Sequence, residues 1–276
     1  MTSGPTPLCT VRYSPAHVQT RPLPYPMGWL KDALHAGGTG GLNWHWHAWQ
    51  SQTLWQPTVA GITRFLQTTA PHRPHLLLLG GSAGWMMPTA WLQSFARIDA
   101  YDIDPFAPWL FQRRHGAVLQ RSGVQVNHHR LDALLHLEDL LAQHPHACLW
   151  FDNMLGQHRY RVRDEVRTEQ ELQALKKRLA GRQWGSVHDL FSGASDLLLD
   201  ATRFEAMCQR NRHAGQLTAD AMQTLLKQSQ AQGVWNDHCT SGVFASDTPT
   251  WWMPWQFRPG YWHWLQAGWV KGDAGS

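Results

Sequence analysis

The feature that most constrains the fold is a short, wholly apolar run that stops at two glycines. His75 is followed by four leucines, and Gly80-Gly81-Ser82-Ala83-Gly84 comes directly after them. A run of this length is typical of a strand buried on both faces of a parallel sheet. Apolar spacing over 85–96 then predicts a helix, and residues 97–102 predict a second strand. The segment therefore has the size of a β-α-β unit, about 30 residues.

The alternation of strand and helix patterns continues through most of the chain. The spacing predicts helices at 106–115, 133–143 and 165–180, and strands at 124–131, 147–152 and 184–189. A longer excursion at 190–215 leads to a helix from Thr218, with Asp220 in its first turn. Two aromatic-rich segments, 234–244 and 251–270, are expected to close the sheet as an antiparallel pair. The expected fold is α/β, with a doubly wound, mostly parallel seven-stranded sheet.

The segment before this alternation has a different character. Six prolines among residues 1–26 favour an extended arm, because proline lacks an N–H and shifts its predecessor away from the α region. A short helix is expected from Met27, then a flexible joint at 37–41 and helical spacing over 42–69, with Pro57 starting a second helix. We expect residues 1–69 to form this arm and a helical cap, and residues 70–276 to form the sheet domain.

Composition narrows the class of protein. Only 16% of residues are charged, and the basic residues behind the net charge of +4 are scattered, which does not indicate nucleic acid as a partner. The four cysteines are far apart, so neither a disulfide framework nor a cysteine zinc site is expected. No signal-peptide pattern and no apolar run of about 18 residues is present. We expect a cytoplasmic protein that does not enter a membrane.

The glycine turn, residues 80–84, and Asp102 together indicate a nucleoside site. Glycines after a strand let backbone N–H groups approach a polar ligand without obstruction by a Cβ atom. Asp102 ends the next strand, where a carboxylate can bind both hydroxyls of a ribose. The alternative is a turn that serves only packing, with Asp104-Pro105 starting a helix. The spacing of the two features favours a nucleoside pocket at the carboxyl ends of the strands.

This order of parts resembles the class I S-adenosylmethionine-dependent methyltransferases over about residues 70–270. The resemblance rests on the glycine turn, on the acidic ends of the second, third and fourth strands, and on the closing antiparallel pair. It implies that the turn wraps the methionine part of the cofactor, that the second-strand acid holds the ribose and that the third-strand acid meets the adenine amino group. These roles fall on Gly80, Gly81, Ser82 and Gly84, on Asp102, and on Asp132.

The resemblance implies S-adenosylmethionine as cofactor and methyl transfer to a small-molecule acceptor. The turn YDIDP at 101–105 is a common form of the family's second motif, but Leu78-Leu79 stands where the first motif has an acid. Loss of that hydrogen-bonding anchor leaves open a non-catalytic relative that binds a ligand or a partner. A nicotinamide-dependent oxidoreductase is a further alternative, because a β-α-β unit with an acidic strand end also suits that cofactor.

Asp152 and Asn153 follow the fourth strand. A polar pair at this rim can face both the cofactor sulfonium and the substrate. The alternative is that the pair caps the next helix, since both residue types are good N-caps.

Two histidine–carboxylate pairs are the candidates for acid–base catalysis. His188-Asp189 ends the fifth strand and Asp237-His238 follows the last helix, so we expect the two pairs to converge over the substrate cleft. A histidine oriented by a carboxylate can take a proton from a hydroxyl, an amine or an acid. The alternative is a structural network between the last strands.

Two other patterns bear on ligand binding. His45 and His47 have a spacing that suits a metal ion on a strand, but no third ligand is evident, and no metal is expected. Tryptophans concentrate at 251–264. Alternating aromatics predict a core-facing strand, with a cage for a flat or cationic ligand as the alternative.

Overall fold

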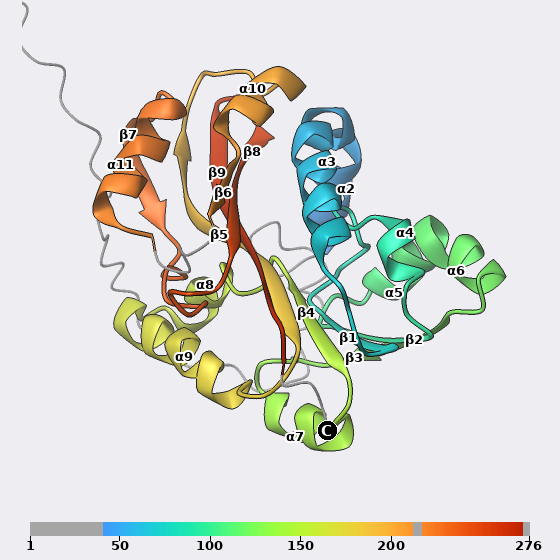
Figure 1. Cartoon of the computed structure of the whole chain (residues 1–276). Helices are drawn as coiled ribbons and strands as arrows, with labels where there is room; N and C mark the ends of the chain where they lie inside the picture. The colour runs from blue at the N-terminus through green and yellow to red at the C-terminus, as the bar shows by residue number, and fades with distance from the viewer. Residues whose placement is uncertain (1–40, 212–216, 273–276) are drawn as a thin grey trace, which may run out of the picture.

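The computed structural model describes residues 41–211 and 217–272. The expected proline-rich arm and the helix from Met27 lie outside the described residues. In the described chain, helices cover both faces of a central sheet (Figure 1). The order of its strands decides the topology and fixes where a ligand site can form.

The described residues form a nine-stranded sheet, and its order confirms the doubly wound fold. The parallel strands run in the order β3-β2-β1-β4-β5, followed by the antiparallel strands β9 and β8 and by β6 at the edge, while β7 pairs with β5. Nine strands replace the seven predicted, because β6 was not predicted and because the last predicted segment forms both β8 and β9. The bounds are β1 His75–Leu79, β2 Arg97–Asp102, β3 Gln125–Arg130, β4 Cys148–Asp152, β5 Trp184–Ala194, β6 Gln209–Asn211, β7 Gln232–Asp237, β8 Thr250–Arg258 and β9 Tyr261–Val270.

The closing antiparallel pair differs from the prediction. Both of its strands come from the last segment, because the chain reverses at Pro259-Gly260, where Gly260 has φ +73°. The segment 234–244 instead contributes part of β7, which pairs with the end of β5. The fifth strand therefore does not stop at Asp189. It passes an irregularity between Asp189 and Phe191 and continues to Ala194.

Two helices also differ from the prediction, and proline accounts for one of them. The helix expected over 85–96 is reduced to α4 at Thr89–Leu92, because Pro88 lacks an N–H and disfavours helix at the residue before it. Pro57 lies inside α3, Gln52–Thr68, instead of starting it. The helix begins earlier because Trp55 is buried there and donates a hydrogen bond from Nε1 to the carbonyl of Phe257 at 2.9 Å.

The helices predicted at 133–143, 165–180 and from Thr218 are present with shifted ends, and the one predicted at 106–115 extends to Arg121. The helices at 158–162 and 201–207 were not predicted. Asp164 is the N-cap of α9 and its side chain accepts a hydrogen bond from the N–H of Arg167, and Thr218 caps α11 in the same way. The bounds of the remaining helices are α2 Leu42–Gln50, α5 Ala107–Phe111, the π-helix η1 Gln112–Gly116, α6 Ala117–Arg121, α7 Leu137–Gln143, α8 His158–Val162, α9 Glu165–Arg178, α10 Ala201–Met207 and α11 Ala219–Gln228.

The core lies on both faces of the sheet. Alternate leucines of β1 belong to different clusters: Leu76 and Leu78 pack with α3 and the last strands, whereas Leu77 and Leu79 pack with α7 and α9. Trp252, Trp255, Trp262 and Trp264 of the last two strands are buried. These four tryptophans are core residues, in line with the packing interpretation of the aromatic tail.

Candidate functional site

The strand order creates one topological switch point, beside β1. The chain proceeds from β1 to β2 and β3 on one side and then crosses to β4 on the other. In open parallel sheets, ligands bind outside the carboxyl ends of the strands at such a point. The glycine turn follows β1, Asp102 ends β2 and Asp152 ends β4. The topology therefore brings these predicted residues to one edge of the sheet.

The glycine turn requires glycine at both of its ends. Gly80 has φ +69° and Gly84 has φ +64°, a region that side chains with a Cβ atom disfavour. A Cβ atom at Gly80 would lie 2.7 Å from Cβ of Met154, and one at Gly84 would lie 2.5 Å from Nε2 of His115. The turn is thus held closely between the loop after β4 and η1.

Asp102 joins the glycine turn to the turn after β2. Its Oδ2 accepts a hydrogen bond from the N–H of Ser82 at 2.7 Å, and its Oδ1 accepts one from the N–H of Asp104 at 2.9 Å. Burial raises the pKa of Asp102 to about 6, and the two backbone donors offset only part of this effect. Each carboxylate oxygen has two lone pairs, so both retain capacity for a ribose hydroxyl.

Helix α2 is tied across this edge, a feature that the sequence analysis missed. Asp104 is buried, and its Oδ2 accepts a hydrogen bond from the N–H of Gly41 at 2.7 Å and lies 2.8 Å from Nε2 of His45. The indole of Trp44 donates to Oγ of Ser82 at 3.2 Å. The sequence signal for this contact was His45, because helical spacing places it on the buried face of α2.

The space at this edge is small. A cavity of about 10 Å³ is lined by Gly81, Ser82, Tyr101, Asp102 and His128, among others. That volume holds roughly one water molecule, whereas small-molecule sites measure about 300–1,000 Å³. The residue types at the turn and at Asp102 suit an adenosyl group, but the cavity is too small to hold one.

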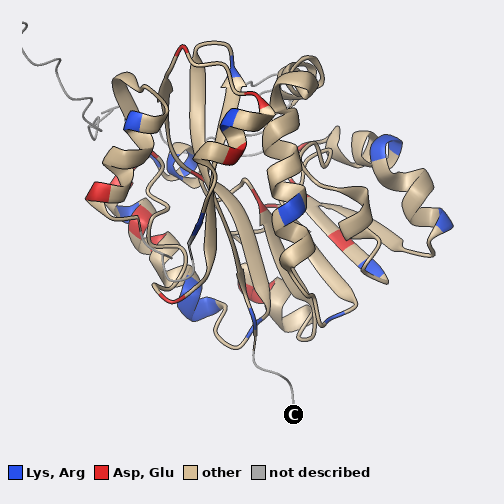
Figure 2. Cartoon of the chain, turned by 45° about the horizontal axis from the view of Figure 1, so that its top comes forward, with Lys and Arg blue, Asp and Glu red and all other residues tan. Residues whose placement is uncertain are grey.

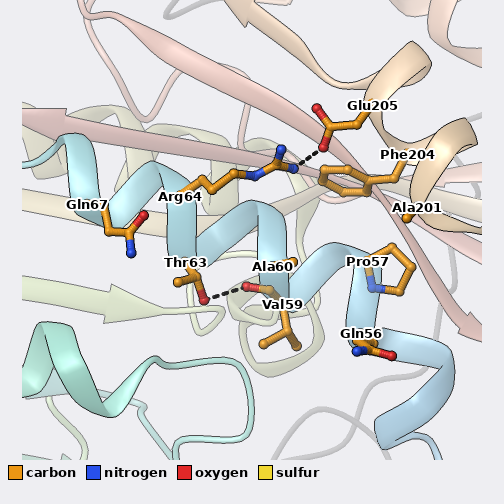
Figure 3. Close-up of a pocket in the computed structure, with 10 residues that line it drawn as sticks. All are labelled: Gln56, Pro57, Val59, Ala60, Thr63, Arg64, Gln67, Ala201, Phe204 and Glu205. Carbon is orange, nitrogen blue, oxygen red and sulfur yellow. Dashed lines mark hydrogen bonds and ion pairs between the residues drawn. The ribbon is translucent and has the colours of Figure 1, made fainter.

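A larger cavity lies elsewhere. It measures about 630 Å³ and is lined by side chains of α3 and α10 (Figure 3). Arg64 and Glu205 form an ion pair across it, and none of the predicted site residues lines it.

The other predicted cofactor residues differ in their surroundings. Asp132 accepts a hydrogen bond from Arg161 Nη1 at 3.1 Å and one from the N–H of Leu134 at 3.2 Å. Burial raises the pKa of Asp152 to about 7, and the nearby charge of Asp102 adds to it. Helix α8 begins at His158 with Gln157 as its N-cap, so Asp152 and Asn153 do not cap it. Oδ1 of Asn153 is buried and has no hydrogen-bond partner among the described residues.

Of the two histidine–carboxylate pairs, the structure brings together one member of each. Asp189 and His238 meet with His263 of β9, and one nitrogen or oxygen atom of each lies within 4.8 Å of the others. We call these three residues the Asp189 cluster. His188 instead lies 3.0 Å, through Nδ1, from Oγ of Ser186, and Asp237 accepts a hydrogen bond from the N–H of Cys239.

The strand period explains this division. Neighbouring residues on a strand point to opposite faces, so His188 and Asp189 cannot share a cleft. Burial lowers the pKa of His188 to about 4, and its Nε2 lies 3.1 Å from Oε1 of Gln266. The sequence analysis did not include His263 among the site residues. The available signal was a polar residue within an aromatic strand.

The hydrogen bonds of the Asp189 cluster fix its protonation. His263 donates from Nδ1 to Oδ1 of Asp189 at 2.8 Å. Burial alone would raise the pKa of Asp189, but the charge and hydrogen bond of His263 outweigh it, and the pKa lies below its usual value. An imidazole held in this way by a carboxylate can accept a proton through its other nitrogen.

The cluster is connected to the glycine turn through the loop after β4. His238 Nδ1 lies 2.9 Å from the carbonyl oxygen of Gly156, and a Cβ atom at Gly156 would lie 2.8 Å from Cβ of Asp189. Met154, in the same loop, contacts Gly80. One short loop therefore lies between the glycine turn and the Asp189 cluster.

Lys and Arg are interspersed with Asp and Glu over the visible helices and loops (Figure 2). Among the described residues, no helix is both long and apolar enough to cross a membrane.

Comparisons with known proteins find similarity in structure only. Neither the protein-family models nor the curated proteins match the sequence. Magnesium protoporphyrin IX methyltransferase from Synechocystis has 16% identity and a TM-score of 0.39, covering 84% of this chain and 86% of its own. An S-adenosylmethionine-dependent methyltransferase from Anabaena variabilis has 14% identity and a TM-score of 0.39, covering 87% and 99%. Geranyl diphosphate C-methyltransferase from Streptomyces coelicolor has 12% identity and a TM-score of 0.34, covering 76% of each chain.

These likenesses are distant, and the strand order identifies the fold. The order β3-β2-β1-β4-β5 with a closing antiparallel strand β9 beside β5 is typical of the methyltransferase form of the Rossmann-like sheet. The chain has the fold of the class I S-adenosylmethionine-dependent methyltransferases.

Proposed function

We propose that the chain binds S-adenosylmethionine at the glycine turn and Asp102 and transfers its methyl group to a small-molecule acceptor. One observation carries the proposal: at the switch point, the N–H of Ser82 in the glycine turn donates to the carboxylate of Asp102 at 2.7 Å. The turn and the acid of a nucleoside site thus form one unit at the edge where such sites occur.

The proposal assigns the cofactor to residues on both sides of the switch point. Gly80, Gly81, Ser82 and Gly84 hold its methionine part, Asp102 its ribose, Asp132 its adenine, and Asp152 with Asn153 its reactive end. The cofactor supplies an electrophilic methyl group on a sulfonium. The unpartnered Oδ1 of Asn153 supports a polar ligand on the β4 side.

The acceptor side is assigned to the Asp189 cluster. His263, oriented by Asp189, takes the proton of the acceptor's nucleophilic group, and His238 lies beside it. His188 and Asp237 form hydrogen bonds with other partners, so we do not include them among the proposed catalytic residues. The rest of the chemistry is alignment of the nucleophile with the methyl group.

Binding is coupled to α2 in this proposal. The helix contacts both turns of the nucleoside edge, through Trp44 to Ser82 and through His45 to Asp104. Admission of a cofactor breaks these contacts, so part of the binding energy is spent on opening.

A second candidate is a non-catalytic protein of the same fold. The cavity of about 10 Å³ and the leucines in place of the first-motif acid favour it. In that case the closed edge is permanent, and a ligand or partner binds elsewhere.

A thermal-shift panel separates these candidates. It comprises S-adenosylmethionine, S-adenosylhomocysteine, NAD, NADP and ATP, each followed by calorimetry where the melting temperature moves. A ligand at about a hundredfold excess over its Kd stabilises the folded state by about 2.7 kcal/mol. Stabilisation by the two adenosyl compounds supports the proposal. A shift with NAD or NADP alone indicates an oxidoreductase, and no shift with any compound indicates the non-catalytic candidate.

A further inference from the structure

The Asp189 cluster has the composition of a metal site as well as that of a proton acceptor. Asp189 lies on β5, His238 directly follows β7 and His263 lies on β9, so only the folded sheet brings them together. Two imidazoles and a carboxylate are ligands that Zn²⁺ accepts at sites with an open position. We propose that these three side chains bind a divalent transition-metal ion, with Zn²⁺ as the ion to test.

The tautomer of His238 is already the one that a metal requires. Its Nδ1 lies 2.9 Å from the carbonyl oxygen of Gly156. A carbonyl only accepts hydrogen bonds, so Nδ1 carries the proton and Nε2 presents its lone pair. Metal-binding histidines usually donate their other N–H to such a backbone or carboxylate oxygen, which fixes the ring. The hydroxyl of Ser192, 2.9 Å from Nε2, now occupies the place of the ion.

The pair of Asp189 and His263 supplies the other two ligands. Nδ1 of His263 and Oδ1 of Asp189 are 2.8 Å apart, with one proton between them. Two ligand atoms of a tetrahedral Zn²⁺ are separated by roughly 3.4 Å, so the pair needs to open by roughly 0.6 Å. The ion replaces the proton, which is released to solvent.

Ser192 has a second partner that lets it leave. Its Oγ also lies 3.0 Å from the hydroxyl of Tyr261, so the hydroxyl can turn to that side when Nε2 of His238 binds the ion. Three protein ligands leave a fourth position open, as in catalytic zinc sites. The ring of Tyr160 lies 5.8 Å from that of His238 and forms part of the surroundings of this position.

A second group of similar composition gives the contrast. His75, Asp99 and His144 also place their ligand-type atoms within 4.8 Å of one another. The carboxylate of Asp99, however, accepts hydrogen bonds from Arg97, His75, Asn127 and His129. Its lone pairs are used, and the guanidinium of Arg97 repels a second cation. Among the described residues, by contrast, no hydrogen bond is made to Oδ2 of Asp189. Arg159 is the arginine whose charge acts on His238, and it is paired with Glu165. Only the Asp189 cluster is expected to bind the ion.

Metal binding itself does not rest on the proposed methyl transfer. A histidine that binds the ion through Nδ1 is no longer held by Asp189 as a proton acceptor. With the ion present, an acceptor bearing a hydroxyl group would occupy the open position, and the ion would make loss of the hydroxyl proton easier. This last step alone depends on the proposed function.

The test is a calorimetric titration of the full chain with Zn²⁺ after treatment with a chelator, in two buffers of different ionisation enthalpy. We expect one ion per chain and release of a proton. Co²⁺ should give the visible absorption bands of a four-coordinate site. His263→Ala should weaken binding at least about 100-fold, because even outer-shell partners of a metal cost about 10–100-fold. The matched control, His144→Ala in the second group, should leave the affinity unchanged.

Several results would overturn the proposal. These are the absence of saturable binding by the wild-type chain, equal affinity in wild type and His263→Ala, or loss of binding in His144→Ala instead. If circular dichroism shows that His263→Ala does not fold, Ser192→Ala takes its place as the test. This variant lacks the hydroxyl that competes with the ion for Nε2 of His238, so binding must persist or tighten. Weaker binding in that variant would contradict the assignment. No adenosyl compound is present, so these outcomes are independent of the test of methyl transfer.

Discussion

Asp102→Asn separates a ligand-binding carboxylate from a structural one. At neutral pH the ionised Asp102 costs folding energy, because burial raises its pKa from 3.8 to about 6. A shift of roughly two units corresponds to about 3 kcal/mol. Asparagine removes this cost but loses one of the two backbone hydrogen bonds from Ser82 and Asp104, worth about 1.5–3 kcal/mol. The two effects nearly cancel, so the free energy of unfolding should change by no more than about 1.5 kcal/mol.

The same change should weaken an adenosyl ligand strongly. Loss of a charged acceptor for the ribose hydroxyls costs about 1.5–3 kcal/mol, or about 10- to 150-fold in Kd. Calorimetry with S-adenosylhomocysteine and urea unfolding of the same sample measure the two quantities. Unchanged affinity in a folded variant would refute the assignment of Asp102 and reduce it to a link between two turns.

Asp99→Asn is the matched control, since Asp99 lies on the same strand. Burial would raise the pKa of Asp99, but hydrogen bonds from Arg97, His129, Asn127 and His75 hold it well below the usual range. The ionised form therefore stabilises the folded state, and this contribution is lost only in strong acid. Its removal should cost about 3 kcal/mol or more in unfolding free energy and leave the affinity for S-adenosylhomocysteine unchanged. If Asp99→Asn weakened ligand binding and Asp102→Asn lowered only stability, the roles assigned to the two carboxylates would be reversed.

Three further predictions follow from the same geometry. Gly80→Ala should destabilise more than Gly123→Ala: both have positive φ, at a cost of about 1–2 kcal/mol, but only Gly80 has a neighbour, Met154, in the place of the new Cβ. Equal losses in urea unfolding would argue against close contact at the turn. Burial lowers the pKa of His188 from 6.5 to about 4, so the unfolded chain binds the proton first and stability should rise by about 3 kcal/mol from pH 4 to 6.5. His188→Gln should flatten this rise, and an unaltered pH profile would count against it. His45→Ala removes a tie between α2 and Asp104, so S-adenosylhomocysteine should bind more tightly even though the protein is less stable. Weaker or equal binding would show that α2 does not close the site.

The fold could be predicted because its signals are local. The leucines of β1 are buried on both faces, and the acid at the end of β2 marks the edge where the strand stops. The closing antiparallel pair was predicted wrongly because the spacing of aromatic residues does not indicate which two strands pair. The reversal at Gly260 and the extension of β5 to Ala194 depend on pairing across the sheet.

The candidate site was predictable only in part, for a different reason. Residues that end neighbouring parallel strands meet at one edge, so the glycine turn, Asp102 and Asp152 could be grouped from their order. His263 reaches Asp189 only through the antiparallel pairing of β9 with β5. Pairing His188 with Asp189 ignored the alternation of side chains along a strand. The contacts of α2 with Asp104 and Ser82 join distant segments, and helical spacing alone could not specify their partner.

Hydrogen exchange with and without S-adenosylhomocysteine tests whether the cofactor binds at the switch point. We expect slower exchange of the amides in the glycine turn and in residues 102–106, because the ligand lies against both turns. We also expect faster exchange in α2, because its contacts with Asp104 and Ser82 must open. No change at the glycine turn under saturating ligand, or protection confined to the cavity between α3 and α10, would contradict the placement of the cofactor at the switch point.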